Sequence, residues 1–68
     1  MAYVKDIFLN LTILENLQLA NTYNLGEDLL VALFNGWDDT ELNITTVKAG
    51  ELSGGQRKTL MNLMTFLT

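Results

Sequence analysis

The sequence contains no cysteine, no histidine and no proline. Without Cys and His, the chain cannot form a disulfide, a thiolate zinc site, a cysteine nucleophile or an imidazole base. Without Pro, low-complexity tracts or charge blocks, nothing marks a linker, so we expect residues 1–68 to form a single small domain. A core of this size supplies only about 3–5 kcal/mol of stability. The hydrophobic content of 49% therefore predicts tight helix packing, self-association, or both.

Positive charge is also scarce. Four Lys and Arg residues stand against eight Asp and Glu residues, which gives a net charge of −4. Only Arg57 and Lys58 are adjacent, whereas Lys5 and Lys48 stand alone. Nucleic-acid binding draws its affinity from clustered cations on one surface. The charge pattern therefore disfavours a DNA- or RNA-binding function, and a helix-turn-helix is a third hypothesis.

Long hydrophobic runs are absent. The longest uninterrupted apolar run extends from Leu29 to Phe34, far below the ~20 residues that span a bilayer. Asp6 and Asn10 interrupt the N-terminal segment where a signal peptide would need its apolar region. We therefore expect a cytoplasmic protein with no membrane span.

Two segments have a clear helical pattern. The first is predicted over residues 25–36, where Asn24 and Glu27 suit a capping box at its start and Gly36 suits its end. The second is predicted over residues 53–67, with Ser53 as its cap, although Gly54 and Gly55 weaken its first turn by roughly 1 kcal/mol each. Apolar residues recur on one face of each helix: Leu29, Leu30, Leu33, Phe34 and Trp37 in the first, and Leu60, Leu63, Met64 and Leu67 in the second.

The N-terminal third allows two interpretations. As a helix it is apolar on two sides, which is typical of a helix between two packed layers and favours oligomerisation. As a β-hairpin it would turn at Glu15-Asn16 between two alternating runs. We prefer the helix, so the expected fold is mainly α, with three to four packed helices; the alternative is α+β with an N-terminal hairpin over residues 4–23. Residues 42–48 are predicted to be an extended connection or part of a short helix. The two faces of the N-terminal helix are Val4, Ile7, Phe8, Leu11 and Leu14 on one side, and Leu9, Ile13, Leu17 and Ala20 on the other.

Residues 52–56 have the sequence LSGGQ, followed by Arg57. This string resembles the signature sequence of ABC-transporter nucleotide-binding domains, whose serine and glycines contact the γ-phosphate of ATP at a helix N-terminus. Such an ATPase also needs a Walker A loop and a Walker B carboxylate. The nearest approach to Walker A begins at Gly50, but it has Gln56 in place of the phosphate-binding lysine. We therefore do not assign the ATPase function of that family to this chain.

The same string has a simpler physical interpretation. Ser53 caps a helix, the glycines form a tight turn, and the cations are solvated or pair with Glu51. An alternative is an anion-binding or nucleotide-contacting site, with phosphate held by backbone amides and nearby cations. Its residues would be Ser53, Gly54, Gly55, Arg57 and Lys58.

Catalysis and metal binding have little support in the sequence. Asp38, Asp39 and Glu41 lie close together, but their spacing lacks the alternating oxygens of a calcium loop. No nucleophile and base occur at a recognisable spacing. We expect no enzyme activity, no cofactor and no metal.

The sequence does not reveal a specific biochemical function, but it favours a class. We expect a small module that works by protein–protein contact, as a homo-oligomer or as a regulator or inhibitor of a larger partner. Accessory proteins of phages and mobile elements are often of this kind. The expected contact surface combines apolar residues of the N-terminal helix with two from the segment 25–37: Leu9, Ile13, Leu17, Phe34 and Trp37.

Overall fold

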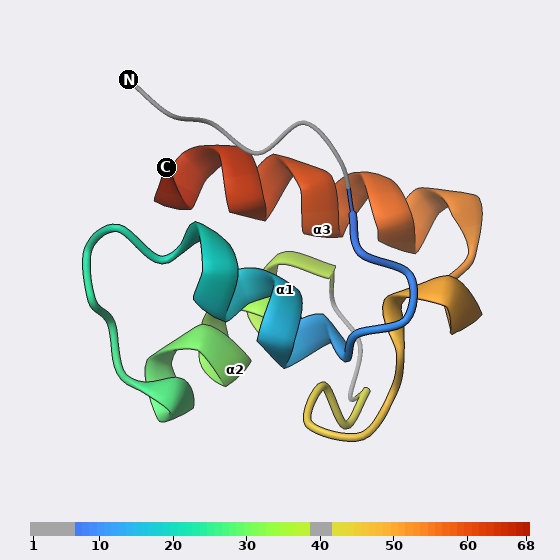
Figure 1. Ribbon diagram of the computed structural model, residues 1–68, viewed down its shortest axis with the longest axis horizontal. Helices are drawn as coiled ribbons and strands as arrows, with labels where there is room; N and C mark the ends of the chain where they lie inside the picture. Colours follow the sequence, from blue (N-terminus) through green and yellow to red (C-terminus); the bar gives the residue numbers. More distant parts are fainter. Residues whose placement is uncertain (1–6, 39–41) are drawn as a thin grey trace.

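The computed structural model describes residues 7–38 and 42–68. These residues form three α-helices, α1 (Ile13–Ala20), α2 (Glu27–Asp38) and α3 (Gly54–Leu67), and one 3-10 helix, η1 (Ala49–Glu51). Each pair of α-helices is in contact, so the three helices pack on one another and α1 contacts both α3 and α2 (Figure 1). The prediction of a mainly helical fold is confirmed. The described residues contain no sheet, only an isolated bridge between Thr12 and Lys48, so the hairpin alternative is not supported.

Helix α1 begins later than the two-faced pattern predicts, because a capping box sets its start. The Thr12 hydroxyl oxygen accepts a hydrogen bond from the Glu15 amide at 3.0 Å, and the Thr12 amide donates to the Glu15 carboxylate at 2.8 Å. These bonds satisfy amides that a helix start otherwise leaves free. Residues 7–12 are therefore not helical, and Val4 lies outside the described residues.

The loop before η1 completes the start of α1. The amide of Ile13 donates to the Val47 carbonyl at 3.0 Å, and the amide of Leu14 donates to the Ile44 carbonyl at 2.9 Å. Residues 44–46 form a turn, so the segment 42–48 is neither a continuous extended strand nor a helix. Its carbonyl groups pair with helix amides that the capping box leaves free, which binds this loop to α1.

Asn16 holds the segment before α1 in place. Its side chain is fully buried. The carboxamide oxygen accepts from the Phe8 amide at 2.8 Å, and the carboxamide nitrogen donates to the carbonyls of Phe8 at 3.0 Å and Thr12 at 2.9 Å. A buried amide with its bonds made costs little, whereas an unpaired one is expensive. Asn16 therefore replaces the regular helical bonds that residues 7–12 lack.

Helix α2 is displaced from its predicted range by two residues. The carbonyl of Gly26 accepts from the amides of Leu29 and Leu30 at 3.1 Å each, so Gly26 precedes the first turn. Asn24 is not the cap that the sequence pattern predicts; it has a φ of 56°, in the left-handed region that Asn tolerates. Asn21 shapes the turn instead, because its side chain bonds both backbone groups of Leu25. The helix then continues past Gly36 to Asp38.

The core occupies the space between the three helices. The helix α1 is not apolar on two sides as the sequence predicts, because residues 7–12 are not helical. Its buried residues lie on one side and pack within one molecule, whereas Leu19 is exposed, as are Phe8 and Leu9 before the helix. The end of α3 is bound to the loop after α1, since the amide and hydroxyl of Thr22 both donate to the Leu67 carbonyl. The buried apolar residues are Ile13, Leu14, Leu17, Ala20, Leu30, Phe34, Ile44, Ala49, Leu52, Leu60, Leu63, Met64 and Leu67.

Across residues 7–38 and 42–68, none of the helices combines the length and the apolar character that a membrane crossing requires.

Candidate functional site

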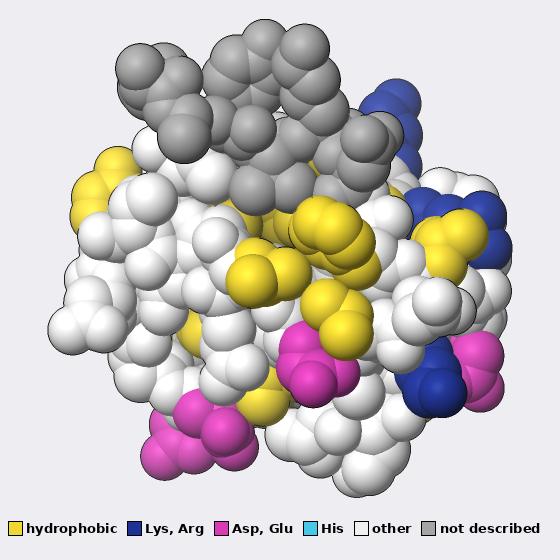
Figure 2. Space-filling view, viewed as in Figure 1, with side chains coloured by type: hydrophobic (Ala, Val, Ile, Leu, Met, Phe, Trp, Pro, Cys, Tyr) yellow, Lys and Arg dark blue, Asp and Glu magenta, His cyan; other side chains and the backbone are white. Residues whose placement is uncertain are grey.

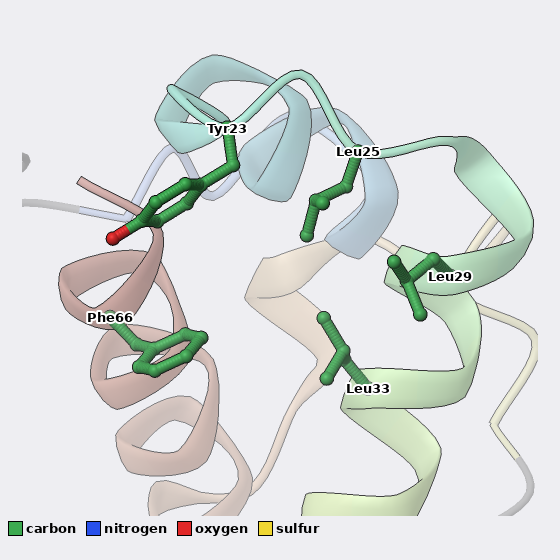
Figure 3. Close-up of a pocket in the computed structure, with 5 residues that line it drawn as sticks. All are labelled: Tyr23, Leu25, Leu29, Leu33 and Phe66. Atoms are coloured by element: carbon green, nitrogen blue, oxygen red, sulfur yellow. The ribbon is translucent and has the colours of Figure 1, made fainter.

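An open apolar pocket lies between α2 and the C-terminal end of α3 (Figure 3). Its volume is about 400 Å³. Leu29 and Leu33 of α2 form one wall, since residues four apart share a helix face. The loop before α2 supplies Tyr23 and Leu25, and α3 supplies Phe66. We call this feature the apolar pocket and define it by these five residues.

Aromatic side chains border the apolar pocket and remain largely exposed. Tyr23 is 64% exposed and Phe66 is 57% exposed. The Tyr23 hydroxyl points away from Leu25 and Leu29, so the ring presents carbon atoms to the pocket (Figure 3). Trp37, which is 51% exposed, meets the Phe66 ring edge to face, with the ring centroids 5.7 Å apart and the planes at 83°. This pair connects the end of α2 to α3 and extends the apolar surface beyond the pocket.

Charged side chains are absent from the lining of the apolar pocket. Between Leu29 and Trp37 on α2, and after Lys58 on α3, the sequence has no charged residue. Lys and Arg side chains gather on the right of the view in Figure 2, near the end of the molecule where α3 begins. The distance from Lys58 to Phe66 along α3 is about 12 Å, at 1.5 Å per residue. The five lining residues are therefore uncharged, whereas acidic residues of α2 border them, with Glu27 and Asp28 before Leu29 and Asp38 after Trp37.

The structure corrects the contact surface that the sequence predicts. Ile13, Leu17 and Phe34 have no exposed surface, because they fill the core between the helices. They are therefore unavailable to a partner in this fold. Leu9 and Trp37 are about half exposed, but Leu9 lies beside Gly50 whereas Trp37 lies beside Phe66. The five predicted residues do not form one surface, and of the two that are exposed Trp37 contacts Phe66 of the apolar pocket.

The residues of the predicted anion site lie together at the start of α3, where they form a second capping box. The Ser53 hydroxyl accepts from the Gln56 amide at 3.2 Å, and the Ser53 amide donates to the Gln56 side chain at 3.1 Å. The Arg57 guanidinium donates to the Gly50 carbonyl at 3.0 Å. The serine and glutamine of the LSGGQ string thus have a structural role in this protein.

The two glycines of that string are not required by the fold. Neither has a positive φ, and a β-carbon at Gly54 or Gly55 would meet nothing within 4 Å. Lys58 is exposed on the first turns of α3. Phosphate binding at this helix start stays a prediction, and a phosphate titration that follows the amide shifts of Gly54 and Gly55 tests it.

The acidic cluster that we considered for a metal lies mostly outside the described residues. Asp38 ends α2, whereas Asp39 and Glu41 belong to residues 39–41, which the structure does not describe. Within the described parts of the chain, no group of acidic side chains is arranged to hold a metal ion.

Sequence reasoning missed most of the apolar pocket. Tyr23 lies in a loop, where no helical periodicity points to it, and Leu25 falls within the predicted range 25–36 although the structure places it in the loop before α2. Phe66 lies beside the apolar stripe of α3, which is a signal of partial burial rather than of a site. Leu29 and Leu33 belong to the predicted stripe of α2, but the pattern does not separate them from the buried Leu30 and Phe34.

Comparison with known proteins finds no match to this chain among protein-family models, curated proteins or solved structures.

Proposed function

We propose that this protein is a non-enzymatic module that works by protein–protein contact, and that the apolar pocket is the centre of its contact surface. The observation that carries the proposal is the group of three aromatic side chains, Tyr23, Trp37 and Phe66, each more than half exposed around a single apolar hollow. Tyr and Trp are enriched at the energetic centres of protein interfaces. Contiguous exposed apolar surface on a small domain is typical of an interaction site.

The chemistry of the apolar pocket favours a protein side chain over a small molecule or a substrate. Pockets for small ligands usually include a few polar groups that orient the ligand. The five lining residues supply only the Tyr23 hydroxyl, which points away from Leu25 and Leu29. No acid, base or nucleophile other than this hydroxyl lines the pocket, which supports a binding function without catalysis.

The proposal includes a regulatory or accessory role in the cytoplasm, of the kind that small phage proteins have. The absence of Cys supports the location, because small secreted domains are usually stabilised by disulfides.

Site-specific photo-crosslinking tests the proposal. The photoreactive residue p-benzoylphenylalanine replaces Phe66 in cells that express the protein, and it replaces Phe8 in a matched control, since Phe8 is also an exposed Phe at 50%. We expect a defined protein adduct from position 66 and a much weaker one from position 8. The change Leu29→Glu should abolish the adduct from position 66. Equal adducts from both positions, or none from position 66 with any protein, would contradict the proposal.

A further inference from the structure

We infer that the partner that covers the apolar pocket is a second copy of this chain, docked about a two-fold axis that passes beside the pocket, between its hollow and the side chains that project at its border. This inference rests on the proposed function and specifies its partner. Three features of the described residues support it: the neutrality of the surface, its shape, and its apolar area.

Neutrality is the first feature. In a two-fold contact the same patch lies on both sides, so a residue near the axis faces its own counterpart. An acidic residue there would face an acidic residue, and like charges brought together without water are costly. The surface around Leu33 and Phe66 has no charged lining residue, although the whole chain carries a net charge of −4. An uncharged lining suits self-association, because no carboxylate of the lining then faces its own counterpart near the axis.

Shape is the second feature. A self-complementary patch must contain both a hollow and side chains that fill the hollow of the other copy. The apolar pocket provides the hollow. The half-exposed side chains of Tyr23, Leu29 and Phe66 at its border provide the projections. Hollow and projections lie next to each other, as two-fold pairing around a central axis requires.

Area is the third feature. A standard interface buries about 800 Å² on each partner, of which about 60% is apolar, so each copy must supply roughly 500 Å² of apolar surface. Tyr23, Trp37 and Phe66 expose between 51% and 64% of their surface. At ~150–250 Å² for each aromatic side chain, they contribute roughly 300 Å² together. Leu29, which is 47% exposed, and the partly buried Leu25 and Leu33 supply much of the remainder.

The dimer is expected to be reversible rather than obligate. The single chain exposes 4300 Å², and a folded monomer of this mass is expected to expose about 4300 Å². One copy therefore reaches the compactness of a complete monomer. Association should accordingly depend on protein concentration, and each copy should keep its helices when it dissociates.

Sedimentation equilibrium of the purified protein over roughly a hundredfold range of concentration is the first test. We expect the mean mass to rise from 7.6 kDa toward twice that value. The change Leu29→Glu should weaken the dimer by about tenfold or more, whereas Leu19→Glu should change it by less than about twofold. Leu19 is the matched control because it is an exposed helical Leu, at 58%, outside the apolar pocket. Circular dichroism confirms that both variants keep their helices.

A disulfide test locates the axis, because the natural chain has no Cys. Asn62 is exposed one turn before Phe66, on the same face of α3. Under mild oxidation, Asn62→Cys should form a covalent dimer faster than Thr46→Cys, which places the thiol in the exposed loop before η1. When Leu29→Glu is added to Asn62→Cys, the covalent dimer should form no faster than it does with Thr46→Cys.

The outcomes separate this inference from the proposed function. A constant monomer mass, equal oxidation rates for the two cysteine variants, or a dimer that resists Leu29→Glu would overturn the second-copy inference. If the crosslinker at position 66 then captures a different protein in a manner that depends on Leu29, the proposed contact surface stands with another partner. If position 66 captures nothing, both the surface and its partner are wrong.

Discussion

The surroundings of α1 and the apolar pocket contain similar residues but differ in how far the rest of the chain buries these residues and pairs their polar groups. Around α1, Ile13 and Leu17 are fully buried, and the buried Asn16 makes three hydrogen bonds. At the apolar pocket, Leu29 and Phe66 remain about half exposed and contribute no polar contacts. Within α1 every apolar side chain except Leu19 is buried in one molecule, whereas the apolar pocket keeps much of its apolar surface exposed. An apolar residue in a helical pattern therefore predicts that its side chain is covered, but not whether the same chain or another molecule covers it.

The packing of the three helices explains this difference. Helix α1 contacts both α2 and α3, so its side chains Ile13 and Leu17 are buried within one molecule (Figure 1). Helices α2 and α3 also contact each other, and the edge-to-face pair of Trp37 and Phe66 joins them beside the apolar pocket. Beside this contact, Tyr23, Leu29, Trp37 and Phe66 remain exposed, because no further element of the described chain covers them.

The largest difference in stability loss should come from the change Leu→Ala made once in α1 and once at the apolar pocket. Leu17→Ala removes a fully buried side chain and should cost about 3 kcal/mol, which is most of the ~3–5 kcal/mol available to a domain of this size. Leu29→Ala, at a site that is 47% exposed, should cost less than about 1 kcal/mol. Urea denaturation followed by circular dichroism, with dilute protein so that association does not contribute, measures both. Similar losses for the two variants would show that the apolar pocket belongs to the core.

Removal of the buried amide should have the next largest effect. Asn16→Ala leaves the Phe8 amide without its partner and should cost about 2 kcal/mol. Exchange of the Ala49 and Gly50 amides with solvent deuterium should also accelerate, because they donate to carbonyls of the segment that Asn16 holds. Asn10→Ala, in the exposed turn nearby, is the control and should stay within about 0.5 kcal/mol. Unchanged exchange at Ala49 would mean that Asn16 does not hold this segment.

A smaller effect is expected at the start of α3. Ser53→Ala removes the acceptor for the Gln56 amide and should cost about 1 kcal/mol. Ser53→Asp keeps an acceptor and adds negative charge at the positive end of the helix dipole, so it should retain the stability of the natural chain. Thermal denaturation of the two variants tests whether Ser53 acts as the cap of α3. If the aspartate variant were as unstable as the alanine variant, capping would not be the function of this serine.

The smallest effect, with the opposite sign, is expected at the glycines. Gly54→Ala and Gly55→Ala should each stabilise the protein by about 0.5 kcal/mol, because their backbone is helical and the added carbon meets open space. Gly50→Ala should instead cost on the order of 1 kcal/mol, because its β-carbon would lie 3.1 Å from the Leu9 carbonyl oxygen. Melting temperatures of the three variants test this difference in sign. A loss at Gly54 would indicate a constraint beyond helix geometry.

The helices themselves were largely predictable. The ranges 25–36 and 53–67 come within two residues of α2 and α3, because apolar spacing and Ser53 are local signals. The start of α1 was harder to predict, because it depends on a capping box at Thr12 and on carbonyls of Ile44 and Val47. Those carbonyls come from a loop some 30 residues further along the chain. The hydrophobic periodicity near α1 therefore gives no information about them.

The sequence by itself determined the class of this protein: a mainly helical chain without disulfides, with more apolar side chains than a small core can bury. Helical periodicity and capping residues act over three or four positions, and they can be read directly. Only the tertiary structure decided which apolar faces are covered. It placed Ile13, Leu17 and Phe34 inside and left Tyr23, Trp37 and Phe66 outside. Burial depends on how the three helices pack on one another, and that arrangement is set by contacts between distant segments rather than by local pattern.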